Sequence, residues 1–541
     1  MGRGCSAFAG MGAGRRRGRA VNREEAIRRI RGEPTEWDVL VIGGGAAGLG
    51  AAVDAAARGY ATVLVEQHDF AKGTSSRSTK LIHGGVRYLR QGNIALVREA
   101  LHERGLLRRL APHLVRDLGF VVPLYAWWEG PFYGFGFKLY DALAGDLGLA
   151  PSRRLSKRET LARIPTVRAE GLLGGVVYHD AQFDDARLAI VLARTLHALG
   201  GVPLNYARAI RLLKRRGRIC GAVVRDEEDP AKPVYEIRAR VVINATGVFA
   251  DRIRRLDCRG AQPLASPSQG VHLVLDRSFL PGDDAIMVPH TEDGRVLFAV
   301  PWKGRALIGT TDTPVRRAVL EPVPLDEEVD YLLRHAARYL ARAPTRDDVL
   351  SMFAGLRPLF GSRKGAPTAA LSREHYIEVS PSGLVTIVGG KWTTYRRMGE
   401  DVVTRAAESA GLPKREPASA DIPLLGAPAM APEPGRLADY GTESSEIEKL
   451  ESAQQNLAAP IHPRLPYCFS QVLWAVQREM ARTVEDVLAR RTRALFLDAR
   501  AALEAAPAVA EQLAEMLTRP RSWVDSQLEE FKKIVQRYLP S

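Results

Sequence analysis

The sequence of 541 residues predicts an α/β protein in three parts: a Rossmann-type parallel sheet, an antiparallel-sheet domain interleaved with it, and a C-terminal all-helical domain. Three observations predict this class. A strand, a glycine turn, a helix and a second strand follow one another at 38–66. Alternating apolar and polar residues fill 202–244 and 268–312, and helical periodicity follows a Pro- and Ala-rich linker at 420–435.

The expected domain boundaries follow from these patterns and from the length, which exceeds what one hydrophobic core supports. Residues 37–425 hold the Rossmann domain, with the segments at about 110–180 and 265–385 assigned to the antiparallel-sheet domain, and 426–541 form the helical domain. Residues 1–36 are basic and predict a disordered tail. Attraction to a membrane or a nucleic acid, or a transit peptide, stays open for this tail.

The composition is that of a folded protein, with 46% hydrophobic and 26% charged residues and a net charge of +15. No apolar run reaches the roughly 18 residues that a membrane-spanning helix needs. The four cysteines have no CxxC pair and no metal-ligand spacing, so we expect a reducing compartment, no metal site and no disulfide framework. The missing CxxC pair also argues against the flavin disulfide reductases.

A dinucleotide-binding unit is predicted around the first strand. The apolar run 39–42 is followed by Gly43, Gly45 and Gly48 in GxGxxG spacing, an Ala-rich helix, and a second apolar strand that ends at Glu66. Gly43 permits the tight turn, Gly45 lets a pyrophosphate approach the backbone, and Gly48 lets helix and strand pack closely. The helix N-terminus faces the phosphates, and Glu66 can accept both ribose hydroxyls, which disfavours NADP. NAD and FAD stay open.

A second element at 73–89, GTSSRSTKLIHGGVRYL, favours FAD. A flavin dinucleotide lies extended across its protein, so a further segment must hold the pyrophosphate and the ring. Three hydroxyls suit phosphate oxygens, and a histidine before two glycines leaves a bare backbone for a planar ring. These residues are Thr74, Ser75, Ser76, His83, Gly84 and Gly85. A Ser- and Thr-rich surface loop that caps the next helix is the alternative.

Together these motifs resemble the FAD-dependent glycerol-3-phosphate dehydrogenases, which are glutathione-reductase-type flavoproteins of the D-amino-acid-oxidase group. The resemblance covers about residues 37–540 and includes FDDARL (183–188), NATGVFAD (244–251), SQGVHLVL (268–275), VPWKGRALIGTTDT (300–313), GLRPL (355–359) and GGKWTTYRRMGED (389–401). It implies a glutathione-reductase-type FAD-binding Rossmann domain, FAD as cofactor, and oxidation of glycerol 3-phosphate to dihydroxyacetone phosphate. Glycerol-3-phosphate oxidase, which uses oxygen, or a related flavoprotein oxidoreductase of the D-amino-acid-oxidase type is the alternative.

Two later motifs extend the expected cofactor site. The apolar strand in VVINATG ends in a turn, and GGKWTTYRRMGED places glycines at a strand-to-helix junction where the flavin would approach. A threonine can cap this helix, whose positive end would face the pyrimidine oxygen and favour the anionic reduced ring. The residues are Thr246, Gly247, Gly389, Gly390, Lys391 and Thr393, with Thr394 as the other candidate cap.

The substrate that the resemblance implies requires cations and a base. A phosphate dianion needs a basic cluster, for which Arg77, Arg357 and Lys391 are the candidates. Oxidation of a secondary alcohol by hydride transfer to flavin N5 needs a group that takes the hydroxyl proton, and His272 in GVHLV is the candidate base. A histidine in an alternating strand is also commonly a satisfied core residue.

The sequence contains no second nicotinamide motif, haem motif or redox cysteine pair that could accept electrons. A diffusible acceptor is left, and the resemblance implies a membrane quinone. We therefore expect peripheral binding to an anionic membrane, on its cytoplasmic side, through a basic and aromatic surface, with a soluble cytoplasmic enzyme as the alternative. The aromatic cluster at 127–140 fits core packing or a cavity lining, or else such a membrane contact. No nucleic acid is expected as a partner, because the phosphate-substrate motifs would then be unexplained.

Two apolar stripes predict helices in the C-terminal domain. The first predicts one helix over 466–492, and the second lies in the last 20 residues of the chain. Packing within a helical cap or in a homodimer is preferred to a helix that lies on a membrane. The stripes consist of Val472, Val476, Met480, Val484 and Leu488, and of Leu528, Phe531, Ile534, Val535 and Tyr538.

Overall fold

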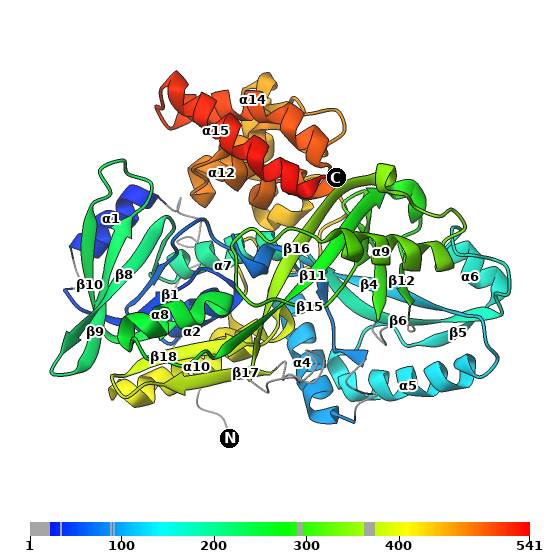
Figure 1. Ribbon diagram of the computed structural model, residues 1–541, viewed down its shortest axis with the longest axis horizontal. Helices are drawn as coiled ribbons and strands as arrows, with labels where there is room; N and C mark the ends of the chain where they lie inside the picture. Colours follow the sequence, from blue (N-terminus) through cyan, green and yellow to red (C-terminus); the bar gives the residue numbers. More distant parts are fainter. Residues whose placement is uncertain are drawn as a thin grey trace.

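The computed structural model describes residues 22–32, 35–86, 89, 92–288, 291, 296–361 and 374–540. Two β-sheets lie beside each other, and a helical C-terminal domain sits over their junction (Figure 1). The predicted α/β class with an antiparallel-sheet domain and helices at the C-terminus is confirmed. In the described part of the chain, no helix has the length and apolar character to cross a membrane.

The first sheet contains the predicted Rossmann unit. Every neighbouring strand pair on its main path is parallel except the edge pair β17–β18, and the helices α10, α2 and α7 pack side by side against it. The strand order is β17 (His375–Val379), β18 (Leu384–Gly389), β10 (Val234–Asn244), β1 (Trp37–Ile42), β2 (Thr62–Val65) and β7 (Val202–Leu204). The helices are α2 (Ala46–Ala57), α7 (Asp185–Ala198) and α10 (Tyr395–Ala410).

Helices α2 and α10 approach closely because each carries a glycine where they cross. A Cβ atom added to Gly399 would lie 2.5 Å from the carbonyl oxygen of Gly50, and one added to Gly50 would lie 2.6 Å from that of Tyr395. Both distances are too short for real side chains, and the obstructing atoms belong to the backbone. The first turn of α10 is therefore fixed against α2.

The alternating segment 202–244 forms the expected meander, but this meander extends the first sheet instead of the antiparallel-sheet domain. Strands β8 (Ala207–Arg215) and β9 (Arg218–Asp226) pair antiparallel with each other and with the first half of β10. Since the second half of β10 pairs in parallel with β1, the meander is continuous with the first sheet rather than with the antiparallel-sheet domain. Helix α8 (Ala250–Asp257) follows β10.

The second sheet is largely antiparallel, with one parallel pair, β4–β12. Its strands come from residues 81 to 360, so β17 and β18, at the end of the expected 265–385 segment, belong to the first sheet instead. The order is β15 (Thr313–Pro314), β11 (Ala265–Asp276), β14 (Arg305–Gly309), β13 (Leu297–Trp302), β12 (Ala285–Val288), β4 (Val115–Leu124), β6 (Gly174–Phe183) and β3 (Leu81–Ile82), with β16 (Val349–Phe360) beside β11 and β5 (Arg153–Ser156) beside β6. Its helices are α4 (Ile94–Leu110), α5 (Glu129–Ala144), α6 (Lys157–Arg163) and α9 (Asp326–Tyr339).

The C-terminal domain is helical, but the helix predicted over 466–492 is interrupted. It ends at Glu479, and Met480 adopts a left-handed backbone conformation with φ of 55°. The Asp486 carboxylate accepts hydrogen bonds from the backbone amides of Arg482 and Thr483 and starts a separate π-helical turn. The last stripe is confirmed as internal packing, with Phe531 and Val535 buried. The helices are α11 (Ser444–Ala453), α12 (Phe469–Glu479), α13 (Ala494–Leu497), α14 (Ala499–Met516) and α15 (Arg521–Val535).

The prediction of a disordered tail at 1–36 is wrong for its second half, which contains a helix. Helix α1 (Arg23–Arg31) buries Ala26 and Ile30, and Asn22 caps its first turn. The Arg23 guanidinium lies 2.6 Å from the Asp226 carboxylate, which neutralises a basic residue that looked solvated in the sequence. Residues 1–21, on which the rest of that expectation falls, lie outside the described residues.

Replacing Gly399 with alanine is expected to lower the free energy of unfolding by about 1–3 kcal/mol, because the new methyl group would push α10 away from α2. Gly134 in α5 is the matched control, since a Cβ atom there meets nothing within 4 Å. Gly134→Ala is expected to leave stability unchanged or raise it by up to about 1 kcal/mol. Thermal and denaturant unfolding of both variants measures this, and equal stability of the two would contradict the packing argument.

Candidate active site

A cavity of about 800 Å³ lies between the two sheets, and both contribute to its wall. One side carries the glycine turn after β1 and the junction between β18 and α10. The other side carries β11, the residues after β14, and β16. This position at the carboxyl ends of β1, β10 and β18 is where open α/β sheets bind nucleotides.

The glycine turn has the geometry that its spacing predicts. Gly43 has φ of 117°, and a Cβ atom there would lie 2.6 Å from the Ala245 carbonyl oxygen. A Cβ atom on Gly48 would lie 1.9 Å from the carbonyl oxygen of Gly43, which confirms that this glycine permits close packing of helix and strand. Gly45 stands at the N-cap of α2 and lines the cavity. The helix thus turns its N-terminus towards the cavity.

Glu66 follows β2 at the cavity wall. One carboxylate oxygen accepts a hydrogen bond from the amide of Gly44 at 2.6 Å, and the other accepts from the amide of His68 at 3.0 Å. Burial raises the pKa of this carboxyl, while the two backbone bonds act in the opposite direction. Each carboxylate oxygen keeps a further lone pair, so Glu66 can still accept ribose hydroxyls as predicted.

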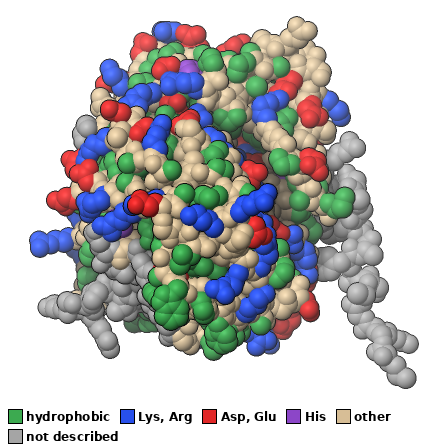
Figure 2. Space-filling model, turned by 90° about the vertical axis from the view of Figure 1, so that its right-hand side faces the viewer, with side chains coloured by type: hydrophobic (Ala, Val, Ile, Leu, Met, Phe, Trp, Pro, Cys, Tyr) green, Lys and Arg blue, Asp and Glu red, His purple; other side chains and the backbone are tan. Residues whose placement is uncertain are grey.

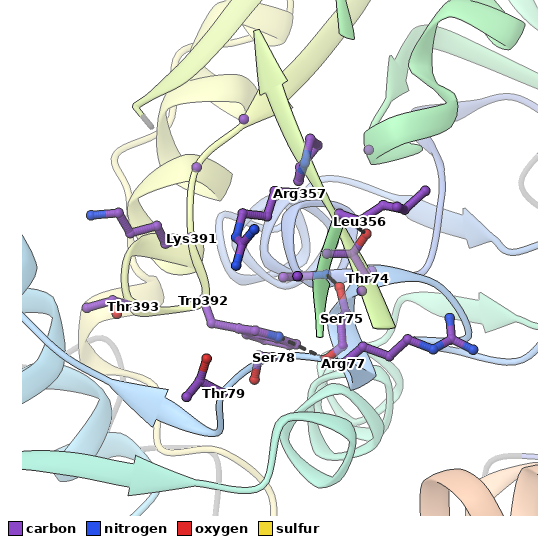
Figure 3. A pocket seen from close by; sticks show the side chains of 18 of the residues that line it. Thr74, Ser75, Arg77, Ser78, Thr79, Leu356, Arg357, Lys391, Trp392 and Thr393 are labelled. Atoms are coloured by element: carbon purple, nitrogen blue, oxygen red, sulfur yellow. Dashed lines mark hydrogen bonds between the residues drawn. The ribbon is translucent and has the colours of Figure 1, made fainter. Parts of the chain in front are cut away.

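In the loop 73–79, some hydroxyls form hydrogen bonds within the protein, while other residues of the loop line the cavity. The Ser75 hydroxyl accepts a hydrogen bond from the amide of Ala46 at 2.9 Å, while the Thr74 hydroxyl donates to the carbonyl of Leu356 at 2.6 Å. Ser76 is buried, and its hydroxyl donates to the Gly73 carbonyl; Ser76 does not belong to the cavity wall. Ser78 and Thr79, which the sequence analysis did not select, do line the cavity (Figure 3).

The predicted ring platform at 83–85 is held from behind. The amide of Gly84 donates to the Tyr140 hydroxyl at 2.8 Å, and a Cβ atom on Gly84 would lie 2.5 Å from Leu101. Gly84 therefore supports the platform from within, whereas His83 and Gly85 line the cavity. The His83 amide also donates to the Thr393 hydroxyl at 3.3 Å, which joins this platform to the junction before α10.

The two later glycine motifs also meet at the cavity. They bring together Thr246, Gly247, Gly389, Gly390, Lys391 and Thr393, all of which line it. Gly247, Gly389 and Gly390 have φ of 57°, 84° and 79°, in the region that favours glycine. The predicted threonine cap is wrong: Thr394 occupies the N-cap of α10 without a capping side-chain bond. The Trp392 indole instead donates to the Ser75 carbonyl at 2.9 Å and locks the junction to the loop (Figure 3).

His272 lies on β11 and forms part of the cavity wall. Its Nε2 atom is 2.9 Å from the Thr79 hydroxyl, and the imidazole stacks on Phe353 with ring centroids 4.9 Å apart. Burial holds the pKa of His272 well below its ordinary value, and the positive charges of Lys80 and Arg357 lower it further. The imidazole is therefore neutral at physiological pH.

Arg357 on β16 projects over the same wall. Its guanidinium donates to the Thr310 hydroxyl at 3.0 Å and to the Thr311 carbonyl at 2.8 Å, and it lies 3.2 Å from the Asp312 carboxylate. These partners orient the guanidinium while a quarter of the side chain stays exposed. Lys391 lines the opposite side (Figure 3).

Arg77 lines the cavity, but its guanidinium is held by partners within the protein. Its guanidinium lies 2.6 Å from the Glu321 carboxylate and donates to the carbonyls of Lys72 and Leu320 and to the Tyr538 hydroxyl. In Figure 3 the side chain extends away from Arg357. Because Arg77 is 5% exposed and its donors are used within the protein, it joins the loop to the C-terminal domain rather than to the other two cations.

The wall fits FAD in its shape and in its chemistry. Backbone atoms fill the space behind Gly43 and Gly48, whereas a Cβ atom on Gly247 would point into open space, so the glycines form an open cradle in front of α2. Glu66 stands at one end for a ribose, and the platform at 83–85 stands at the other. FAD would be held along this line, and when bound it supplies a hydride acceptor.

Comparisons with known proteins agree with this site. The family model described as FAD dependent oxidoreductase matches residues 38–396, and that of the C-terminal domain of alpha-glycerophosphate oxidase matches 435–523. The mitochondrial glycerol-3-phosphate dehydrogenase of Bos taurus is 38% identical over 96% of this chain and 76% of its own, and that of Saccharomyces cerevisiae is 36% identical over 93% and 90%.

A solved structure gives the same result for the fold. The glycerol-3-phosphate dehydrogenase of Bacillus halodurans, solved in complex with FAD, superposes with a TM-score of 0.77 and 29% identity over 96% of this chain and 98% of its own. The L-alpha-glycerophosphate oxidase of Mycoplasma pneumoniae, at 17% identity and a TM-score of 0.54, shares the fold. The chain is thus an FAD-dependent oxidoreductase that belongs to the FAD-dependent glycerol-3-phosphate dehydrogenase family.

Proposed function

We propose that this enzyme oxidises sn-glycerol 3-phosphate to dihydroxyacetone phosphate and passes the electrons to a membrane quinone. One observation carries the substrate assignment: a neutral buried imidazole and an oriented guanidinium stand on the same wall of the FAD cavity. A secondary alcohol with a phosphate group needs both. The names of the similar dehydrogenases support the same substrate.

His272 takes the hydroxyl proton in this proposal. Its imidazole is neutral, lines the cavity and is bonded to Thr79, whose hydroxyl lines the cavity too. Because Thr79 can both donate and accept, it fixes the orientation of the imidazole whichever ring nitrogen carries the proton. The alternative of a satisfied core histidine is less favourable, since the Nδ1 atom of His272 is buried without a hydrogen-bond partner in the described part of the protein.

Arg357 binds the phosphate in this proposal, and Lys391, on the opposite side of the cavity, is the second candidate cation. A guanidinium suits a phosphate dianion because its planar donors match two oxygens. Thr310, Thr311 and Asp312 fix Arg357 from one side and leave the exposed part of its side chain to a ligand. Arg77 does not contact the phosphate in this proposal. Its ion pair with Glu321 holds the loop that carries Ser75 and Thr79.

The acceptor proposal is based on the outer face of α5. Its inward side chains Tyr133, Phe137 and Tyr140 are buried, whereas large apolar side chains on the other face are exposed. These are Phe132, Phe135 (77% exposed) and Leu139 on α5, together with Trp127 (82% exposed) and Trp128 just before it. Such a face is unusual for a water-exposed helix and suits the acyl boundary of a membrane.

This apolar face, defined by Trp127, Trp128, Phe132, Phe135 and Leu139, is continuous with the cavity. Three of its residues, Phe132, Phe135 and Leu139, also line the cavity, which therefore opens beside α5. Phe120, Tyr178 and Phe298 continue the apolar lining inward. In Figure 2 hydrophobic side chains gather at the foot of the face shown, with Lys and Arg side chains around them. A quinone could enter here from a bilayer, and an anionic leaflet would attract the basic rim.

The second candidate function is oxidation of the same substrate with oxygen. The match of residues 435–523 to the C-terminal domain model named after alpha-glycerophosphate oxidase favours it. A soluble enzyme would then need no membrane face. A homodimer stays a prediction, and the stripe of α15 gives it no support because its residues pack inside the chain. The side of the membrane also stays a prediction.

Anaerobic addition of sn-glycerol 3-phosphate to the FAD-loaded protein is expected to bleach the flavin absorbance, whereas glycerol should not. Reoxidation by a short-chain ubiquinone is expected to be faster than by oxygen and to produce little hydrogen peroxide. Stopped-flow spectroscopy and a peroxide assay measure the two half-reactions. Failure to bleach would contradict the substrate, and one peroxide per substrate would favour the oxidase.

Replacing Arg357 with alanine is expected to lower kcat/KM for glycerol 3-phosphate roughly ten- to a hundredfold, because one charge-assisted phosphate contact is lost. Arg77→Ala is the comparison. It should lower the free energy of unfolding by about 3 kcal/mol, since it leaves the buried Glu321 carboxylate with Lys72 alone. Steady-state kinetics and unfolding curves separate the two roles. Unchanged kinetics in Arg357→Ala with an intact flavin spectrum would remove Arg357 from the phosphate site.

The apolar face of α5 can be tested with liposomes. A Trp127→Ser, Phe132→Ser, Phe135→Ser variant is expected to lose at least about tenfold in co-sedimentation with phosphatidylglycerol vesicles, because each side chain contributes roughly 1.5–3 kcal/mol when buried. Met430→Ser is the control, since Met430 is equally exposed but lies outside this face. A chain lacking residues 1–21 should still bind, and binding should weaken with salt. Equal binding of the triple variant and the wild type would place membrane contact elsewhere.

A further inference from the structure

Lys80 is a buried cation that the proposed reaction does not use. It follows the loop 73–79, is completely inaccessible to solvent, and does not line the cavity. Its ammonium donates to the Asp185 carboxylate at 2.7 Å and to the carbonyl of Ser76 at 2.8 Å. Burying a lysine ammonium costs free energy unless carboxylates compensate its charge, and the carboxylate bonded directly to Lys80 is that of Asp185.

Three aromatic rings surround this ammonium, and each comes from a different element. Its Nζ atom lies 5.4 Å from the ring of Trp302 on β13, 5.1 Å from Phe353 on β16 and 5.4 Å from Phe496 on α13. Asp185 begins α7. Lys80 therefore stands where the first sheet's helix, the second sheet and the C-terminal domain meet.

The other charged groups around Lys80 are nearly balanced. The Arg493 guanidinium lies 3.2 Å from the Asp185 carboxylate and 3.6 Å from that of Asp184. Lys303 lies 3.6 Å from Asp184 and also pairs with Asp439. Arg493 and Lys303 thus face three carboxylates, and the Lys80 ammonium is the third cation that balances their charge.

Lys80 is linked to His272 in two ways. The Phe353 ring that the ammonium approaches is the ring on which the imidazole stacks, at a centroid distance of 4.9 Å. The residue before Lys80, Thr79, is hydrogen-bonded to the imidazole Nε2 atom. The charges that act on His272 are those of Lys80 and Arg357, and both are positive.

We propose that Lys80 is a positioning residue for His272: its buried ammonium, behind Phe353, disfavours the imidazolium form and keeps the imidazole ready to accept the substrate proton. This inference rests on the proposed role of His272 as the base. After the hydroxyl proton has moved to His272, the same charge favours its release, so the imidazole returns to the neutral form.

The direction of both pKa values agrees with this geometry. Burial is the largest cause that lowers the pKa of His272, followed by Lys80 and then Arg357. Burial also lowers the pKa of Lys80 to about 7, against the attraction of Asp185. Lys80 is therefore charged below neutral pH, where its charge adds to the effect of burial on His272, and it loses its charge above neutral pH.

The test is the pH dependence of flavin reduction by glycerol 3-phosphate in Lys80→Met. Removing the positive charge raises the pKa of His272. The acid limb of kcat/KM, which is the fall in rate as His272 becomes protonated, should therefore move to higher pH by about one unit in the variant, while the two proteins should match within about threefold at pH 8. The variant can fold, because Asp185 keeps hydrogen bonds from Ser78, Ala186 and Arg493. Lys80→Arg retains the charge and should restore the wild-type profile.

Arg194→Met is the matched control. Arg194 is also a buried cation beside an aromatic ring and pairs with Glu443 at 2.5 Å, but it is not among the charges that act on His272. Arg194→Met should lower the free energy of unfolding but leave the acid limb of the kcat/KM profile at the wild-type pH. An acid limb of Lys80→Met that coincides with that of wild type, in folded protein with bound FAD, would overturn the proposal, as would an equal shift in Arg194→Met.

A second measurement separates this proposal from the proposed function. The His272 imidazole can be titrated through its Cε1–H resonance in histidine-labelled protein and assigned with His272→Asn. Its pKa should rise in Lys80→Met, fall back in Lys80→Arg and stay unchanged in Arg194→Met. An unchanged titration in Lys80→Met overturns the role of Lys80 even if the substrate is correct. A shifted titration in a protein that glycerol 3-phosphate does not reduce supports the Lys80–His272 coupling and rejects the substrate.

Discussion

The buried carboxylate of Asp185 is the interaction on which the cavity depends. It is inaccessible to solvent and accepts hydrogen bonds from the amide and hydroxyl of Ser78, from Lys80 and from Arg493. These donors come from the loop 73–80 and from the C-terminal domain, while the carboxylate itself begins α7. A buried carboxylate is tolerated only when its donors are fixed. The loop, the helix and the domain are therefore positioned together, and with them the hydroxyls that face the cavity.

The features that could be predicted from the sequence are those with a short-range cause. Gly48 is required by its contact with Gly43 in the same turn, and Gly43 has a positive φ in that turn, so the spacing alone predicts both glycines. The strands β1 and β2 are continuous apolar runs because the parallel sheet buries both faces. The same holds for the glycines before α10, whose positive φ angles no other residue adopts easily.

The features that could not be predicted depend on distant partners. Arg77 has the residue type and the position of a substrate ligand, but its partner Glu321 is far away in sequence and takes the guanidinium. Thr74 and Thr79 have the same side chain and both line the cavity, and only the proximity of Leu356 and His272 decides which partner each hydroxyl has. The break of the helix at Met480 had a local signal, since Thr483 and Asp486 have the spacing of a helix start.

Beside the line along which FAD would lie, two parts of the cavity wall have opposite chemistry. His272, Arg357 and Thr79 make one end polar, whereas Phe120, Tyr178 and Phe298 make the arm towards α5 apolar. A charged phosphate ester would lose its hydration in the apolar arm without compensation, and a quinone would leave the donors at the polar end unpaired. Each reactant in the proposed function is thus confined to its own end. In the proposed function, the donor and the acceptor then need not displace each other.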